Sequence, residues 1–101
     1  MNQMQQMLMQ AQKMQRDLAK AKQELASKDF LIEKNGMVSV TLKGDKTISE
    51  IKIDEDALDP ENKEMLEETL ALAINEGLEK IIEEEDEIEE KITGRSGGFG
   101  F

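Results

Sequence analysis

The sequence predicts an α+β fold in which two long helices flank a three-stranded antiparallel meander, in the order α-β-β-β-α. Three observations support this prediction. Apolar residues recur at helical spacing over residues 2–26, and they alternate with polar residues over 29–54, as in half-buried strands. A second helical pattern follows from about Pro60 to Ile92. A chain of 101 residues suits one domain with a modest core.

The first helix is predicted by a heptad pattern that no proline or glycine interrupts. A spacing of 3.5 residues sustained over three heptads is typical of a long helix that packs along another helix. Methionine and alanine dominate this pattern, and such side chains allow close and adaptable packing. The repeating positions are Met4, Ala11, Leu18 and Leu25, with Met7, Met14 and Ala21 between them.

The first two strands are predicted to form a hairpin. Phe30 and Ile32 alternate with Leu31 and Glu33 in the first strand, and Asn35-Gly36 is the strongest hairpin signal in the chain. The second strand shows the same period of two, and its turn follows at once in the sequence. In that turn we expect Gly44 to supply a positive φ and Asp45 to bond its own backbone. The alternating apolar residues of the second strand are Val38, Val40 and Leu42.

Ile48 has the wrong parity for the face that Ile51 and Ile53 share in the third strand. Either a β-bulge redirects the strand, or Ile48 contacts something on the far side. Placed on the far side, it joins Leu31 and Met37 as apolar residues that a three-stranded sheet leaves exposed. Apolar residues on that face predict a cover supplied by another subunit. We therefore predict a homodimer interface at Leu31, Met37 and Ile48.

The second helix is predicted to begin at Asp59-Pro60, because Asp caps helices and Pro suits their first position. Gly77 lies on its apolar face and is expected to let the first helix approach closely. Residues 83–90 form an acidic run that suits a solvated face, and Gly94 can end the helix. We assign residues 1–92 to a single domain and expect 93–101 to be a disordered tail.

The composition excludes several classes of function. Cysteine and histidine are absent, so disulfides, thiol nucleophiles, imidazole bases and nitrogen or sulfur metal sites are excluded together. The carboxylates and serines show no catalytic spacing, and an EF-hand match at Asp54 fails at Leu58 and Asp59. We predict no enzyme activity, no catalytic residues, no metal and no cofactor. Without a signal peptide or membrane-spanning run, the expected location is the cytoplasm, with no membrane partner.

The net charge of −10 is unevenly distributed. Residues 1–26 hold four basic and two acidic residues, a net of +2, and residues 27–53 hold five and four, a net of +1. Residues 54–101 hold four basic and 17 acidic residues, a net of −13. An argument about charged partners therefore has to use the distribution rather than the total.

The first helix carries the best binding signal. Lys13, Arg16 and Lys20 are spaced i, i+3 and i+7, which places them on one face, and Lys22 flanks them. With the heptad residues facing another helix, these cations point outward as a stripe that can meet phosphates. An ordinary solvated helix face explains the same residues, and from them alone it is the commoner outcome.

Several short stretches together resemble the YbaB/EbfC family of bacterial nucleoid-associated proteins. They are Gln12-Lys-Met-Gln15, Asn35-Gly-Met-Val-Ser-Val40, Ile48 through Lys52-Ile-Asp54, and Asp59-Pro-Glu-Asn-Lys-Glu-Met-Leu66 with Ala73-Ile-Asn75. The resemblance implies a helix, three strands and a helix, assembled as a tweezer-like homodimer that binds double-stranded DNA with little sequence preference. It also implies a location in the nucleoid and partners among recombination or replication proteins.

The acidic run is the departure from the family that bears on function, because it lies on an arm expected near DNA. The main hypothesis is a dimeric, non-enzymatic protein that binds DNA through Lys13, Arg16, Lys20 and Lys22. One alternative is an adaptor that binds proteins of DNA repair or replication through its acidic C-terminal arm. Another is a purely structural coiled-coil dimer.

Overall fold

The structure is a computed structural model that describes residues 2–94 of the chain. It confirms the α-β-β-β-α order, with three antiparallel strands in the order β1-β2-β3. Two short 3-10 turns, η1 and η2, lead from the sheet into the second helix. The elements are α1 (Gln3–Ala26), β1 (Asp29–Lys34), β2 (Val38–Lys43), β3 (Ile48–Ile53), η1 (Glu55–Leu58), η2 (Pro60–Asn62) and α2 (Lys63–Thr93).

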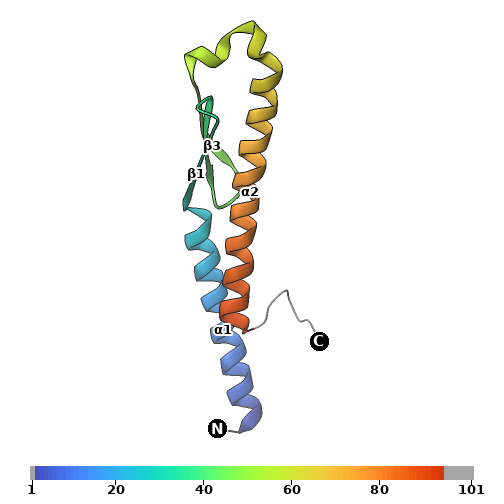
Figure 1. Ribbon diagram of the computed structural model, residues 1–101. Coiled ribbons are helices and arrows are strands. Elements are labelled where there is room, and N and C mark those ends of the chain that lie inside the picture. The colour runs from blue at the N-terminus through green and yellow to red at the C-terminus, as the bar shows by residue number, and fades with distance from the viewer. Residues whose placement is uncertain (1, 95–101) are drawn as a thin grey trace.

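The sheet and α1 both pack against the long helix α2. Figure 1 shows the sheet and α1 end to end along the same side of α2, with α1 antiparallel to it. The first turns of α1 extend past the end of α2. The result is a narrow molecule that measures 71 × 27 × 14 Å along its principal axes. Such a shape buries little surface for each residue, so a large part of both helices stays exposed to solvent.

The core lies between the sheet and the middle of α2. Val40, Leu42, Ala73 and Ile81 are fully buried there. Gly77 lies on this side of α2, and a Cβ placed on it would come within 2.4 Å of Leu42 Cδ1. The close approach at Gly77 therefore serves the sheet and not α1, which corrects the neighbour that the sequence suggested.

Gly44 is needed for a different reason from the one that we predicted. Its φ is not positive, and the residue in this turn with a left-handed backbone is Lys46, with φ 71°. A Cβ on Gly44 would come within 1.7 Å of the backbone oxygen of Leu25, at the end of α1. The Gly44 amide donates to the Lys28 carbonyl at 2.9 Å. The absence of a side chain thus allows the β2–β3 turn to pack directly on the end of α1.

The Asn35-Gly36 turn forms as the sequence predicts. Both residues have positive φ, 55° and 64°, as a type I′ turn requires. The Met37 amide donates to the Lys34 carbonyl at 2.9 Å and closes the turn. The thioether of Met37 then lies 3.9 Å from the hydroxyl of Thr69 on α2.

A β-bulge explains the parity of Ile48. The register between β2 and β3 shifts at Thr41/Leu42. On one side of the shift Ile51 pairs with Val40, and on the other side Ile48 pairs with Leu42. Residues that pair directly have their side chains on the same face of a sheet. Ile48 therefore lies on the helix-facing side, and its placement on the far face with Leu31 is wrong.

Only Leu31 remains of the apolar residues that we placed on the far face. Met37 packs against the core beside α2 and is half-buried. The strand residues around Leu31 on that face are largely polar, and Lys43 and Asp29 form an ion pair there at 2.6 Å. The far face therefore has the character of an ordinary solvated sheet surface.

The seam of α1, defined as Met4, Met7, Ala11, Met14, Leu18, Ala21 and Leu25, is covered over part of its length. Leu25 is buried, and Leu18 and Ala21 are half-buried. Met4 and Met7 are exposed, since α2 ends before it reaches them. The predicted helix is thus confirmed, together with a partner helix along its second half.

Candidate nucleic-acid interface

The basic stripe, defined as Lys13, Arg16 and Lys20, lies on the outer face of α1. All three residues are exposed. Seven residues of helix span about 10 Å, and each strand of DNA carries one phosphate per about 3.4 Å of axis. The stripe therefore matches about three successive phosphates of one strand. Among the ion pairs of residues 2–94, none involves a member of the stripe, so its charges are available to an external anion.

Lys22 differs from the other three predicted DNA-binding residues. Its ammonium lies 3.5 Å from a carboxylate oxygen of Glu89 on α2. Lys22 follows Lys20 by two residues, and a step of 200° around the helix turns it away from the stripe toward α2. The structure thus brings Lys13, Arg16 and Lys20 onto one face and places Lys22 in a contact between the helices.

The acidic run, defined as Glu83–Glu90, is partly neutralised by lysines of the same chain. Glu84 pairs with Lys28 at 2.7 Å, and Glu85 pairs with Lys46 at 3.1 Å. These contacts, together with the Lys22–Glu89 pair, place the run beside the second half of α1 and the β2–β3 turn. The run does not lie beside the first residues of the chain, because α1 extends beyond the end of α2.

The remaining acids of the run lie on the outer face of α2. Asp86 and Glu90 are exposed and four residues apart, on the side of α2 away from Ile88, which packs against the core. Each helix is about 10–12 Å across with its side chains, so the basic and acidic outer faces are about 20 Å apart. Exposed charges are screened over about 8 Å at physiological ionic strength. The acids therefore do little to cancel the potential of the basic stripe at short range.

The last three residues of α2, near the stripe, are Lys91, Ile92 and Thr93 and include no acid. A shallow groove lies between this end of α2 and α1, and both Lys91 and Lys13 line it. Asp17 is the one acid among the residues that line this groove. The groove residues are Gln10, Lys13, Met14, Asp17, Lys91 and Ile92. A phosphate that approaches Lys13 from this side also meets the charge of Lys91.

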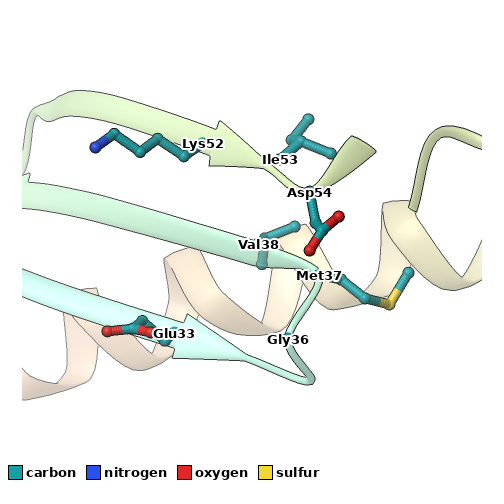
Figure 2. A pocket seen from close by; sticks show the side chains of 7 residues that line it. All are labelled: Glu33, Gly36, Met37, Val38, Lys52, Ile53 and Asp54. Atoms are coloured by element: carbon teal, nitrogen blue, oxygen red, sulfur yellow. The ribbon is translucent and has the colours of Figure 1, made fainter. Parts of the chain in front are cut away.

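A cleft at the end of the sheet offers no catalytic arrangement. Figure 2 shows Glu33 and Lys52 pointing away from Asp54, so the carboxylates do not converge. The Asp54 side chain accepts from the Asp56 amide at 2.9 Å and begins η1, and its amide donates to the Met37 carbonyl at 2.8 Å. The carboxylate is therefore occupied in local structure.

Residues 2–94 offer neither a metal site nor a membrane span. Within residues 2–94, acidic side chains form no cluster of three that could hold a metal ion. Over the same residues, neither helix combines the length and the apolar character that a membrane crossing requires.

An exposed apolar surface that the sequence did not predict is formed by the helix-facing side of β3 and by α2. We call it the β3 face and define it as Ile48, Ile51 and Ile82, which are 44%, 45% and 46% exposed. It exists because α2 covers β1 and β2 and leaves β3 beyond its edge. The bulge at Ser49 was the signal that could have revealed it, since the bulge places Ile48 and Ile51 on one face.

These features define a class of protein: a small non-globular α-β-β-β-α chain with a basic stripe on a projecting helix. Sequence comparison identifies the family. The profile of the YbaB/EbfC DNA-binding family matches residues 1–96, and the chain belongs to that family. A nucleoid-associated protein of Enterococcus faecalis is 40% identical over 98% of this chain and 96% of its own length. Another from Mycoplasmopsis pulmonis is 46% identical over 85% of each chain. The resemblance to this family is thereby confirmed.

Proposed function

We propose that this protein is a non-enzymatic component of the bacterial nucleoid that binds double-stranded DNA as a homodimer, with little sequence preference. The basic stripe on α1 is the observation that carries the proposal. Lysine and arginine contacts to phosphates supply affinity without reading sequence. The family is a DNA-binding family, and its relatives are named as nucleoid-associated proteins, which supports both the ligand and the location.

Salt dependence tests this mode of binding. A dimer presents the stripe twice, so six cations engage at most about six phosphates, and the slope of log K against log salt is then no steeper than about −5. We expect affinity to fall by at most about 10³-fold between 50 and 200 mM salt. Fluorescence anisotropy with two DNA duplexes of unrelated sequence measures both the slope and the sequence preference. A shallow slope with strong preference for one duplex contradicts phosphate binding.

The homodimer is supported by the β3 face. Ile48, Ile51 and Ile82 are each nearly half exposed. The half-buried Ile53 is two residues from Ile51 on the same face of β3, and the half-buried Leu78 is four residues before Ile82 on α2. Contiguous apolar surface of this kind marks an interaction site. A second copy fits it because a two-fold contact brings the same apolar face to both partners. Of the predicted interface residues, Ile48 remains in this proposal, whereas Leu31 lies on the opposite face and Met37 packs on α2.

Sedimentation velocity at micromolar concentration is expected to give about twice the chain mass of 11.4 kDa. Ile51→Lys is expected to give the monomer mass, since it places a charge within the apolar contact. Leu31→Lys is the matched control, because Leu31 is 56% exposed on the other face of the sheet, and it is expected to remain dimeric. If Leu31→Lys dissociates the dimer and Ile51→Lys does not, the interface lies on the face of the sheet that carries Leu31, which contradicts the proposal.

A protein-binding role is the second candidate, and the outer face of α2 favours it. Glu79, Glu83, Asp86 and Glu90 are exposed along that helix, and Leu72, about two turns before Glu79, is 59% exposed. Such a surface suits a basic, partly apolar partner, including the recombination or replication proteins that the family resemblance suggests. The two roles are compatible, because the acidic and basic outer faces belong to different helices.

A further inference from the structure

The first turns of α1 carry an apolar surface that no other part of residues 2–94 covers. We call it the arm stripe and define it as Met4, Met7, Leu8 and Ala11, which together with Gln3 line one shallow groove. Met4 is 78% exposed, and Met7 is 65% exposed. The helix α2 ends before it reaches this part of α1 (Figure 1). The arm stripe is therefore the free end of the seam that α2 covers farther along α1.

The arm stripe has the features of one helix of a coiled coil. Met4, Met7, Ala11 and Met14 follow the heptad spacing, at the positions that face a partner helix. Residues that flank such a contact normally select the partner through ion pairs. None of the flanking residues here is charged, so a charged helix of another protein gains no ion pair from them. These flanking residues are Gln3, Leu8, Gln10 and Gln15.

A second copy of the chain fits the arm stripe better than a charged partner does. Each chain carries a net charge of −10, so two copies repel each other over most of their surfaces. Residues 2–12 contain no Asp, Glu, Lys or Arg side chain. Two arms can therefore approach each other with little of this repulsion.

We propose that the arms of two copies pair antiparallel through their arm stripes and so join one homodimer to another. In a pair centred on residue 9, Met7 of each copy lies opposite Ala11 of the other, and Met4 lies opposite Met14. Each small alanine thus faces a long methionine side chain, which is flexible enough to fill the space that the alanine leaves. The sizes of the side chains therefore complement one another in this register.

The arm pair and the contact at the β3 face require different partners. From residue 9 to Ala26, α1 rises by about 25 Å, so the sheet ends of the two paired α1 helices are about 50 Å apart. The sheets lie beyond those ends (Figure 1), and the β3 faces of two copies with paired arms cannot meet. Each homodimer then has two arms for other homodimers. The joining of homodimers rests on the homodimer proposed above, whereas the arm pair itself does not.

The arm pair leaves the basic stripe free and is weak. Lys13, Arg16 and Lys20 occupy heptad positions that point away from the contact, and they are exposed. The contact involves residues 3–15 at most, fewer than the roughly 20–30 residues that each partner gives to a stable interface. We therefore expect homodimers to remain separate at micromolar protein and to join at submillimolar protein, or where they are crowded on DNA.

Chemical cross-linking at submillimolar protein tests the arm pair, because the sequence contains no cysteine. Gln10→Cys places a thiol beside the two-fold axis, where residue 10 of one copy flanks residue 10 of the other. A short bis-maleimide is expected to link two such chains. Met9→Cys is the matched control, because Met9 lies at the same height on the outer face of the helix and is 53% exposed. We expect the cross-link to be lost at this position.

Met7→Lys, added to Gln10→Cys, is expected to abolish the cross-link, since it places a charge within the apolar contact. Circular dichroism is expected to show unchanged helix content, because Met7 is exposed in the single chain. Equal cross-linking at residues 9 and 10, absence of the cross-link from Gln10→Cys, or its persistence after Met7→Lys overturns the proposal.

Two further samples separate the arm pair from the homodimer. Adding Ile51→Lys to Gln10→Cys is expected to keep the cross-link, and its loss means that the arms meet only within one homodimer. Sedimentation equilibrium at submillimolar protein is expected to give a mass above two chains for the wild type and two chains for Met7→Lys. A wild type that stays at two chains overturns the joining of homodimers. A monomeric wild type at micromolar protein contradicts the homodimer alone, whereas failed cross-linking contradicts the arm pair alone.

Discussion

Reversal of Lys13, Arg16 and Lys20 to glutamate is expected to abolish DNA binding. The variant replaces six cations of the dimer by six anions, and the phosphate contacts that supply affinity become repulsive. At 50 mM salt we expect affinity to fall at least about 100-fold and the salt slope to approach zero. Circular dichroism provides the control for folding, because the three positions are exposed on the outer face of α1.

Lys22→Glu is the matched single-site comparison. Lys22 lies in the same helix and carries the same charge, but its ammonium pairs with Glu89. A reversal at Lys20 alone is therefore expected to weaken DNA binding more than one at Lys22. The reverse order contradicts the placement of the stripe on the outer face.

Neutralisation of the outer acids tests the other half of the electrostatic argument. Glu83→Gln, Asp86→Asn and Glu90→Gln leave the Lys28–Glu84 and Lys46–Glu85 pairs intact. We expect DNA binding to tighten modestly at low salt, since the acids contribute long-range repulsion that salt screens. If the wild-type protein binds no DNA and the neutralised variant does, the result supports the adaptor role. If neither binds, the basic stripe is an ordinary solvated face.

Gly44→Ala is expected to have the largest effect on stability. The new methyl group would lie 1.7 Å from the Leu25 carbonyl oxygen, which is backbone and cannot rotate away. The end of α1 has to separate from the β2–β3 turn, with loss of the bond from the Gly44 amide to the Lys28 carbonyl. Overpacking costs about 1–3 kcal/mol and more where the neighbour is rigid. We expect a loss of at least about 3 kcal/mol.

Thermal unfolding measures this loss. One kcal/mol corresponds to about 4–8 °C in Tm for a domain of this size, so a decrease of at least about 12 °C is expected. Gly36→Asn is the matched control, because Gly36 has a positive φ of 64° and open space around its Cα. Asparagine tolerates that backbone conformation, and we expect little change in Tm. An unchanged Tm for Gly44→Ala means that α1 does not pack on this turn.

The sequence by itself determined the elements and the family. The heptad of α1, the alternation in β1 and β2, the Asn35-Gly36 turn and the Gly94 end are all local patterns, and each forms as predicted. The spacing of Lys13, Arg16 and Lys20 also follows from helix geometry alone. Local spacing suffices in these cases, because each depends only on residues close together in the chain.

The tertiary structure decided which surfaces the elements present to one another. The bulge at Ser49 places Ile48 on the helix-facing side, and α1 extends past the end of α2, so the acidic run lies beside the second half of α1. Gly44 and Gly77 proved to serve contacts with Leu25 and Leu42, which lie 19 and 35 residues away in the sequence. Contacts of this kind depend on register and on how far one helix extends past another, and no local pattern encodes either of them.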